Sequence, residues 1–295
     1  MAGGFEAHGI NPLTLGARLR YRVQAQPPRV PHENPMHSEG ARRLGFPEGL
    51  VVGVTGYGWM THLAAAALGR DWLDRGSFSV TFLRPFHYGQ QATLAAEVDV
   101  HTGSQTRLVC RAFTATHGDN PVALATMAVE RDREPPTIDL ADYRAAPLPE
   151  MADRPIATLK NFPPGKSLGS IEVKLDRALV DAHLEVLGES LSIYKGQDAP
   201  IFPGLYLSMC NWAFELNYLA IPWMHLKSAG QHLGPSRVGD ELAVRGVVHK
   251  TFEEGGRRQV QLDLVIVANG KRPVAKVRHT VAYELYETTA ASEGR

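Results

Sequence analysis

The chain has 295 residues, which is long enough for two ordinary domains or one large one. Its 31 Lys and Arg residues balance its 31 Asp and Glu residues, so it has no basic surplus to neutralise nucleic-acid phosphates or an anionic membrane surface. Cys110 and Cys210 have no metal-binding or redox spacing, and no apolar run reaches the length of a membrane span. We therefore expect a cytoplasmic protein without metal, cofactor, nucleic-acid or membrane partners.

In chain order, the first half is predicted to contain a polar segment, an apolar helix and four strands. The helix falls within 50–68 and is apolar nearly all round, as expected of a helix covered on most sides. Val, Leu, Thr and Phe then recur with the partial alternation of half-buried antiparallel strands. The four strands are predicted at 78–82, 92–100, 107–115 and 122–131.

The second half repeats this order after a segment rich in Pro, Ala and Asp. That segment, 134–164, has little periodicity and is predicted to be a linker. A helix within 201–220 follows it, and 289–295 is predicted to be a disordered tail. The strands of the second half are predicted at 224–232, 241–250, 257–267 and 273–286.

Three blocks of similar sequence indicate that the chain is an internal duplication. Leu83, Pro85 and Gly89 correspond to Leu233, Pro235 and Gly239 at an offset of 150. The hairpin turns at 118–123 and 270–275 share Gly, Pro, Val and Ala at an offset of 152, and Gly53 matches Gly204 at an offset of 151. Any function is therefore expected at a cleft that the two copies share.

An apolar helix followed by a long antiparallel sheet is the plan of the hotdog fold, in which the sheet wraps the helix. We therefore predict an α+β tandem double hotdog, with units at 1–133 and 165–288 and two antiparallel sheets that each wrap a central helix. Two hotdogs in one chain are expected to pair their sheets edge to edge and to form clefts along the seam.

The segment before the first helix carries the most informative motif. It reads His32-Glu33-Asn34-Pro35-Met36-His37, followed by the turn Gly45-Phe46 and by Gly53 at the helix start. It resembles the signature of MaoC-like dehydratases and R-specific enoyl-CoA hydratases, which is Asp-x-Asn-Pro-x-His, then Gly-Phe, then His-Gly.

This resemblance implies that His37 is the catalytic histidine. His32 occupies the position of the family's catalytic Asp, and Val52 replaces the His of the His-Gly pair. The reaction that the resemblance implies is the addition of water to a 2-enoyl thioester. It needs one group to deprotonate water and another to protonate the α-carbon. The missing carboxylate has three candidate substitutes, which are His32 itself, the neighbouring Glu33, or a carboxylate from the other copy.

The resemblance also suggests roles for nearby groups. Asn34 is expected to orient water or His37. Backbone N–H groups at Val52, Gly53 and Val54 are expected to bind the thioester oxyanion, because a helix N-terminus has unsatisfied donors and partial positive charge. Tyr57, early in the helix, is a further candidate to contact the substrate.

The second copy has a degenerate version of the same loop. Glu189 stands at the position of the family's Asp, and Tyr194 at that of its His. Both are expected to be structural or to line the acyl tunnel, which leaves the first copy as the working one. The histidines outside the motif, including those at 62, 87, 225 and 279, are assigned to surfaces or strand faces because they have no ligand spacing.

We therefore predict a lyase of lipid metabolism, a hydratase or dehydratase that interconverts 2-enoyl and 3-hydroxyacyl thioesters. Coenzyme A or carrier-protein pantetheine is expected as part of the substrate, and a homodimer is possible. The alternatives are a non-catalytic protein that binds acyl thioesters and, with less support, a hotdog thioesterase. A thioesterase usually needs a carboxylate on or beside the helix, and 50–68 contains none.

Overall fold

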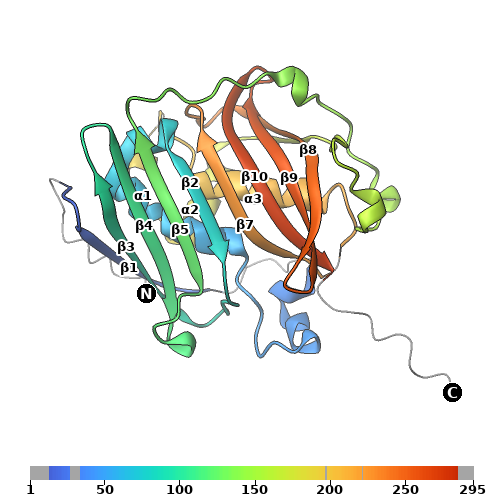
Figure 1. The fold of residues 1–295 in the computed structure, drawn as a ribbon, viewed down its shortest axis with the longest axis horizontal. Coiled ribbons are helices and arrows are strands. Elements are labelled where there is room, and N and C mark those ends of the chain that lie inside the picture. Colours follow the sequence, from blue (N-terminus) through green and yellow to red (C-terminus); the bar gives the residue numbers. More distant parts are fainter. Residues whose placement is uncertain (1–12, 27–33, 197, 221, 285–295) are drawn as a thin grey trace.

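The computed structural model describes residues 13–26, 34–196, 198–220 and 222–284, and the predicted tail at 289–295 lies outside them. Within the described residues, the strands form one antiparallel sheet with helices on one face (Figure 1). The strand order is β1-β3-β4-β5-β2-β7-β10-β9-β8-β6. The helices are α1 (Gly53–Arg75), α2 (Arg177–Leu187) and α3 (Pro203–Glu215). The strands are β1 (Arg18–Gln24), β2 (Ser77–Phe82), β3 (Gln91–His101), β4 (Gln105–Thr114), β5 (Ala123–Glu130), β6 (Ile171–Lys174), β7 (Met224–His232), β8 (Glu241–Glu254), β9 (Arg257–Ala268) and β10 (Arg272–Glu284).

The sheet of the first copy joins that of the second through β2 and β7. These two strands pair antiparallel, from Ser77 opposite Gln231 to Thr81 opposite Lys227. The prediction of two separate sheets was therefore wrong, although edge-to-edge pairing was expected. Pairing the two inner edges satisfies backbone groups that would otherwise be exposed along the seam, and it makes the two copies one continuous structure.

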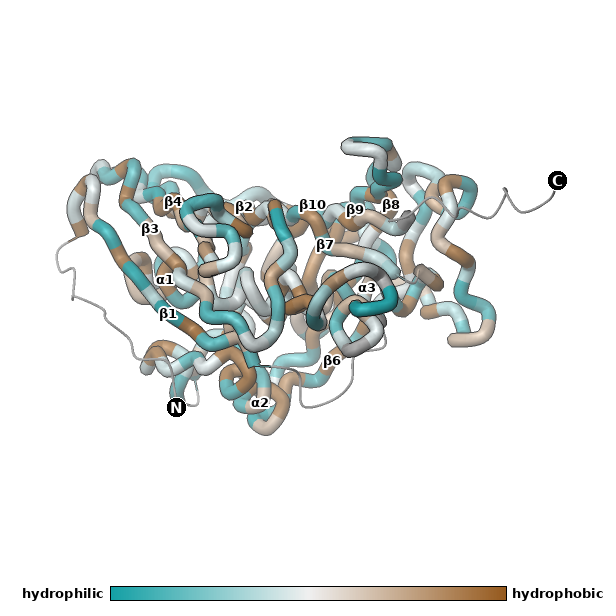
Figure 2. The backbone as a smooth tube through the Cα atoms, turned by 90° about the horizontal axis from the view of Figure 1, so that it is seen from below, coloured by the Kyte–Doolittle hydropathy of each residue, from teal (hydrophilic) through white to brown (hydrophobic). Residues whose placement is uncertain are grey.

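The helices α1 and α3 lie on the same face of the sheet (Figure 2). The first half of α1 is buried on nearly all sides, as its all-round apolar sequence predicts. Close packing with the second copy depends on Gly58, where an added Cβ would lie 2.7 Å from Leu187 Cδ2 and 3.0 Å from Phe202 Cζ. The interior of the first copy thus continues into the second.

All eight predicted strands and both predicted helices are present. Most bounds differ by a few residues, but α1 continues to Arg75, beyond the predicted limit at 68. The elements β1, β6 and α2 were not predicted. The predicted linker, 134–164, falls between β5 and β6 and carries only single 3-10 turns. It is nevertheless packed, because Tyr143 covers Val265 and Val267 of β9, and Phe162 contacts the ring of Tyr218.

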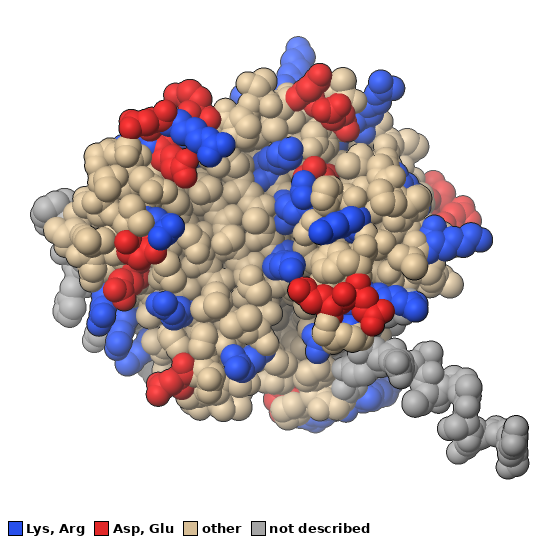
Figure 3. All heavy atoms as spheres, viewed as in Figure 1, with Lys and Arg blue, Asp and Glu red and all other residues tan. Residues whose placement is uncertain are grey.

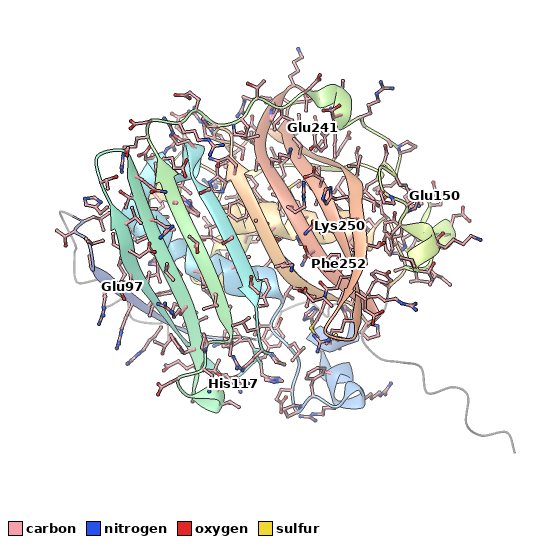
Figure 4. All side chains as sticks on the ribbon, viewed as in Figure 1. Glu97, His117, Glu150, Glu241, Lys250 and Phe252 are labelled. Atoms are coloured by element: carbon pink, nitrogen blue, oxygen red, sulfur yellow. The ribbon has the colours of Figure 1, made fainter. Side chains whose placement is uncertain are left out.

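Charged side chains are spread over the outer face of the sheet. Acidic and basic groups are interspersed around its rim, and basic groups also lie over the middle of this face (Figure 3). Glu97 lies near the β1 edge (Figure 4), where it pairs with Arg18 at 3.4 Å. Arg18, Arg20 and Arg22 are all exposed on β1, and such charges discourage pairing with another chain at this edge. None of the helices in the described residues is long and apolar enough to cross a membrane.

Candidate active site

The segment before α1 folds so that His37 meets the start of the helix. A 3-10 turn at Pro35–His37 is followed by another at Glu39–Leu44, which Ser38 caps by accepting a hydrogen bond from Gly40 N. Gly45 ends it with a φ of 85°, a left-handed conformation that favours glycine. The amide of Leu50 then donates to Met36 O at 2.7 Å, which closes the loop beside the helix.

His37 is held in a defined orientation. Its ring Nδ1 lies 2.8 Å from Leu50 O, and because a carbonyl can only accept, Nδ1 carries the proton. In the neutral ring this makes Nε2 the acceptor nitrogen. The side chain is buried against the wall of a pocket, so the ring is positioned there rather than in a solvated turn.

This pocket lies on the seam between the copies and contains about 1060 Å³ of space, counted out to solvent. Most of its wall is apolar, and both copies contribute to it. The first copy contributes His37, Val52, Gly53, Trp59, Phe82 and Phe86, among others, and the second contributes Asn211, Trp223, Met224, His225, Leu226 and Arg257. The expectation that the shared seam forms a cleft is therefore confirmed.

The N-terminus of α1 forms part of the pocket wall at Gly53. The first helical hydrogen bonds come from the amides of Thr55 and Gly56 to Val52 O, so the amides of Gly53 and Val54 precede them. Burial raises the pKa of the Tyr88 hydroxyl, and the nearby backbone of Val52 partly opposes this effect. An added Cβ at Gly53 would lie 3.0 Å from Phe82 Cε2, so this ring packs closely on the helix start and would have to shift to admit a side chain there.

Asn34 links the loop that carries His37 to the second copy. Its side-chain amide donates to Trp223 O at 3.0 Å, and its Oδ1 accepts from Met36 N at 3.2 Å. These contacts fasten the His37 loop to the second copy, and Asn34 does not line the pocket that His37 lines. Asn34 therefore holds the loop that carries His37, and the alternative that it orients water stays a prediction.

The predicted residues of the second copy form a separate buried cluster. The Glu189 carboxylate lies 2.9 Å from His62 Nδ1 and accepts from the amides of Ser190 and Leu191, both at 2.7 Å. Tyr194 is buried near it, and the negative charge of Glu189 adds to the effect of burial in raising the pKa of Tyr194. Neither Glu189 nor Tyr194 lines the pocket.

Tyr57 and Val54 turn their side chains into the interior of the first copy. The Tyr57 ring is fully buried against Phe78, with ring centres 5.4 Å apart. Neither Tyr57 nor Val54 is among the residues that line the pocket. His32 and Glu33 lie outside the described residues.

No described residue lining the pocket is Asp or Glu. Among the described residues, the second copy therefore supplies no substitute carboxylate, and it supplies the neutral groups of Asn211 and His225 instead. The described residues also contain no cluster of three or more groups that could hold a metal ion. Burial raises the pKa of the Cys110 thiol to about 12 and raises that of Cys210 as well, so neither cysteine is an activated nucleophile.

The assignment of the remaining histidines to surfaces or strand faces was wrong for His62, which is buried on α1 and reaches Glu189. His225, His232 and His279 do lie on strands, and their side chains are buried. Burial lowers the pKa of His232 to about 4 and that of His279 to about 3. Inward positions in the strand alternation were the available sequence signal for the last three.

No protein-family model and no curated protein matches this sequence. Solved structures do match its fold. A MaoC-domain protein from Chloroflexus aurantiacus, named as a dehydratase, superposes with a TM-score of 0.67 at 11% identity, over 96% of this chain and 99% of its own. A conserved hypothetical protein from Mycobacterium tuberculosis, described as a double hotdog, gives a TM-score of 0.61 at 13% identity, over 92% of this chain and 97% of its own.

A protein from Novosphingobium aromaticivorans named as a thioesterase is similar at a lower level, with a TM-score of 0.51 at 13% identity, over 90% of this chain and 95% of its own. Structural similarity at such identities carries the fold and not the activity. The predicted resemblance to MaoC-like dehydratases thus extends over almost the whole fold, and the chain is a double hotdog.

Proposed function

We propose that this protein is a hydratase or dehydratase that interconverts a 2-enoyl thioester and a 3-hydroxyacyl thioester at the seam pocket. The observation that carries the proposal is the position of His37 and Gly53. A histidine with its Nδ1 proton fixed by Leu50 O and an N-terminus of a buried helix line the same apolar pocket. This pairs a base with an oxyanion site, as addition of water to an enoyl thioester requires.

The thioester carbonyl is placed at the amides of Gly53 and Val54. These donors precede the first helical hydrogen bonds, and the helix dipole favours the negative charge that develops on the oxygen as the enolate forms. The acyl chain then lies against the aromatic rings of Trp59, Phe82 and Phe86, which line the pocket.

His37 serves as the acid and base. In the hydration direction, Nε2 takes a proton from water as the oxygen attacks C3, and the electron pair of the double bond moves to the thioester enolate. The imidazolium then returns the proton from Nε2 to C2, which completes the addition of H and OH and restores the neutral ring. The carbonyl of Leu50 keeps Nδ1–H in place throughout, so the same ring nitrogen handles the proton in both steps.

The pocket chemistry favours this reaction over thioester hydrolysis. A hotdog thioesterase usually needs a carboxylate to activate water, and no described residue of the pocket wall is Asp or Glu. Glu215, the carboxylate on α3, lies at a different and smaller cavity. Two exposed cations at the pocket, Arg84 and Arg257, suit the phosphates of coenzyme A or of a pantetheine carrier.

The test is the loss of enoyl-thioester absorbance with short, medium and branched 2-enoyl-CoA substrates. Wild type is compared with His37→Ala and with the matched control His87→Ala. His87 is also buried, and its Nδ1 lies 3.1 Å from Glu48 O, but it does not line the pocket. The two variants therefore lose similar structural contacts, and only one loses the proposed base.

We expect His37→Ala to lower kcat/KM by at least about 100-fold, which is the usual contribution of a general acid or base, and His87→Ala to leave most of the activity. Equal losses in both variants would show that His37 acts only through the structure. If wild type binds these acyl-CoAs in a calorimeter but converts none, the alternative function is supported, in which the protein binds acyl thioesters without catalysis.

A further inference from the structure

Three residues on the wall of the seam pocket each carry a buried polar atom that has no hydrogen-bond partner. Trp59 Nε1, Asn211 Oδ1 and His225 Nδ1 are each fully enclosed, and none of them is paired within the described part of the chain. The three residues are 4%, 4% and 7% exposed. Trp59 comes from α1 of the first copy, Asn211 from α3 and His225 from β7 of the second, and all three line the same pocket.

Buried polar atoms without partners lower the stability of the fold. A buried donor or acceptor without a partner typically destabilises a protein, so native structures pair nearly all of them. Three in one ligand-sized pocket indicate that the pocket is built for an occupant that pairs them. Trp59 can only donate and Asn211 Oδ1 can only accept, so the occupant needs both an acceptor and a donor.

His225 is held as a neutral group by its surroundings. Its Nε2 lies 2.9 Å from Ser228 Oγ, which in turn lies 2.8 Å from His279 Nδ1, and the two imidazole centres are 4.2 Å apart. Burial first, and then the nearby His279, lower the pKa of His225 well below its ordinary value. A neutral imidazole against a neutral amide selects a neutral polar group and not a carboxylate or a phosphate.

We infer that Trp59, Asn211 and His225 form a subsite for a hydroxyl group on the acyl part of the ligand. A hydroxyl donates one hydrogen and accepts others, so it pairs with both kinds of atom, whereas a keto oxygen only accepts and leaves Asn211 Oδ1 unpaired. The inference deepens the proposed function and rests on it for the acyl-thioester class of the ligand. A site built to bind a hydroxyl rejects the chain that lacks it, because its own polar groups are then left buried and unpaired.

The hydroxyl has two possible sources, the one that the reaction forms at C3 or a second one farther along the chain. The Phe82 ring contacts both regions of the site. Its edge packs on the helix start at Gly53, and its centre lies 4.9 Å from that of His225. The subsite is thus adjacent to the reacting centre, and ligands hydroxylated at different carbons distinguish the sources.

The experiment measures binding by calorimetry in the His37→Ala background, in which the proposed base is absent and the ligand is not consumed. The ligands are octanoyl-CoA, 3-hydroxyoctanoyl-CoA and 5-hydroxyoctanoyl-CoA. Two further substitutions, Asn211→Leu and His225→Phe, are introduced separately. His183→Phe is the matched control, because His183 is a half-buried histidine on α2 that does not line the pocket.

We expect one hydroxylated ligand to bind at least about tenfold tighter than octanoyl-CoA, and each pocket substitution to remove most of that preference while the control keeps it. Preference for the 3-hydroxy ligand identifies the reaction's own hydroxyl, and preference for the 5-hydroxy ligand identifies a second one. Equal binding of all three ligands overturns the inference, as does a preference that survives both substitutions. Because this readout needs no turnover, a failure of the proposed catalysis leaves it interpretable.

Protein stability gives a second readout that a structural role would not produce. Asn211 contributes an unpaired acceptor, so Asn211→Leu is expected to raise the thermal midpoint of the ligand-free protein while it weakens binding of the hydroxylated ligand. A lowered midpoint would mean that Asn211 stabilises the fold and would overturn its assignment to the subsite.

Discussion

The packing of α1 against the second copy can be tested with two glycines that lie two residues apart on one helix. At Gly58 an added Cβ meets Leu187 Cδ2 at 2.7 Å and Phe202 Cζ at 3.0 Å, and both partners are buried. At Gly56 the nearest atom is Phe82 Cε1 at 3.9 Å, which is ordinary contact. Gly56→Ala and Gly58→Ala therefore make the same chemical change in different surroundings.

Both substitutions gain about 0.5–1 kcal/mol, because Ala in a helix interior loses less conformational entropy on folding than Gly. Gly58→Ala must also displace Leu187 and Phe202, and overpacking of this kind costs about 1–3 kcal/mol. We expect Gly56→Ala to raise the free energy of unfolding and Gly58→Ala to lower it or leave it unchanged. The two variants should differ by about 1–3 kcal/mol.

Urea unfolding followed by tryptophan fluorescence and far-UV circular dichroism measures this difference. The two probes should report a single transition, because α1 and the β2–β7 pairing join both copies into one interior. Equal stability of the two variants would refute the close packing between the copies. Two separate transitions would refute the shared interior.

Three further predictions concern titratable and charged side chains. His232 and His279 are buried as neutral groups with pKa values of about 4 and about 3, so the fold should be sensitive to acid. Their contribution to the free energy of unfolding is complete above pH 6.5 and is lost as the pH falls toward 4, and for His232 it amounts to about 3 kcal/mol. Urea titrations that gave the same stability at pH 7 and pH 5 would contradict their neutral burial. Glu189→Ala removes the carboxylate that pairs with His62, and it should lower the free energy of unfolding by about 3 kcal/mol. Most of the enoyl-CoA hydration activity should remain. A large loss of kcat/KM in correctly folded protein would place the working site in the second copy. Arg257→Ala should raise KM for coenzyme A substrates several-fold with little change in kcat, and a change in kcat alone would exclude a role in phosphate binding.

Much of the fold could be predicted because the chain repeats itself. Alternation placed the strands, and the all-round apolar helices required a sheet to cover them. The strand β1 was missed because only two of its seven residues are buried and its exposed positions include three arginines. The helix α2 was missed although Asp176 caps its start and Gly188 ends it in a left-handed conformation, both of which are signals visible in the sequence.

The part of the candidate site that is local in the sequence could be predicted, and the part that depends on contacts between the copies could not. His37 and Gly53 are close in the sequence, so their motif predicted that they would lie together. Asn211 and His225 reach the pocket only because β2 pairs with β7 and brings the second copy across the seam. The contact between Glu189 and His62 could not be predicted either, because the two residues are 127 positions apart and belong to different copies.

The most direct test of the account is a crystal structure of the His37→Ala variant with 3-hydroxyoctanoyl-CoA bound. We predict that the thioester oxygen lies within hydrogen-bonding distance of the amides of Gly53 and Val54, with C2 and C3 facing the space left by the His37 ring. A ligand bound instead beside Glu189 and His62, or with its thioester remote from the start of α1, would contradict the assignment of the seam pocket as the active site.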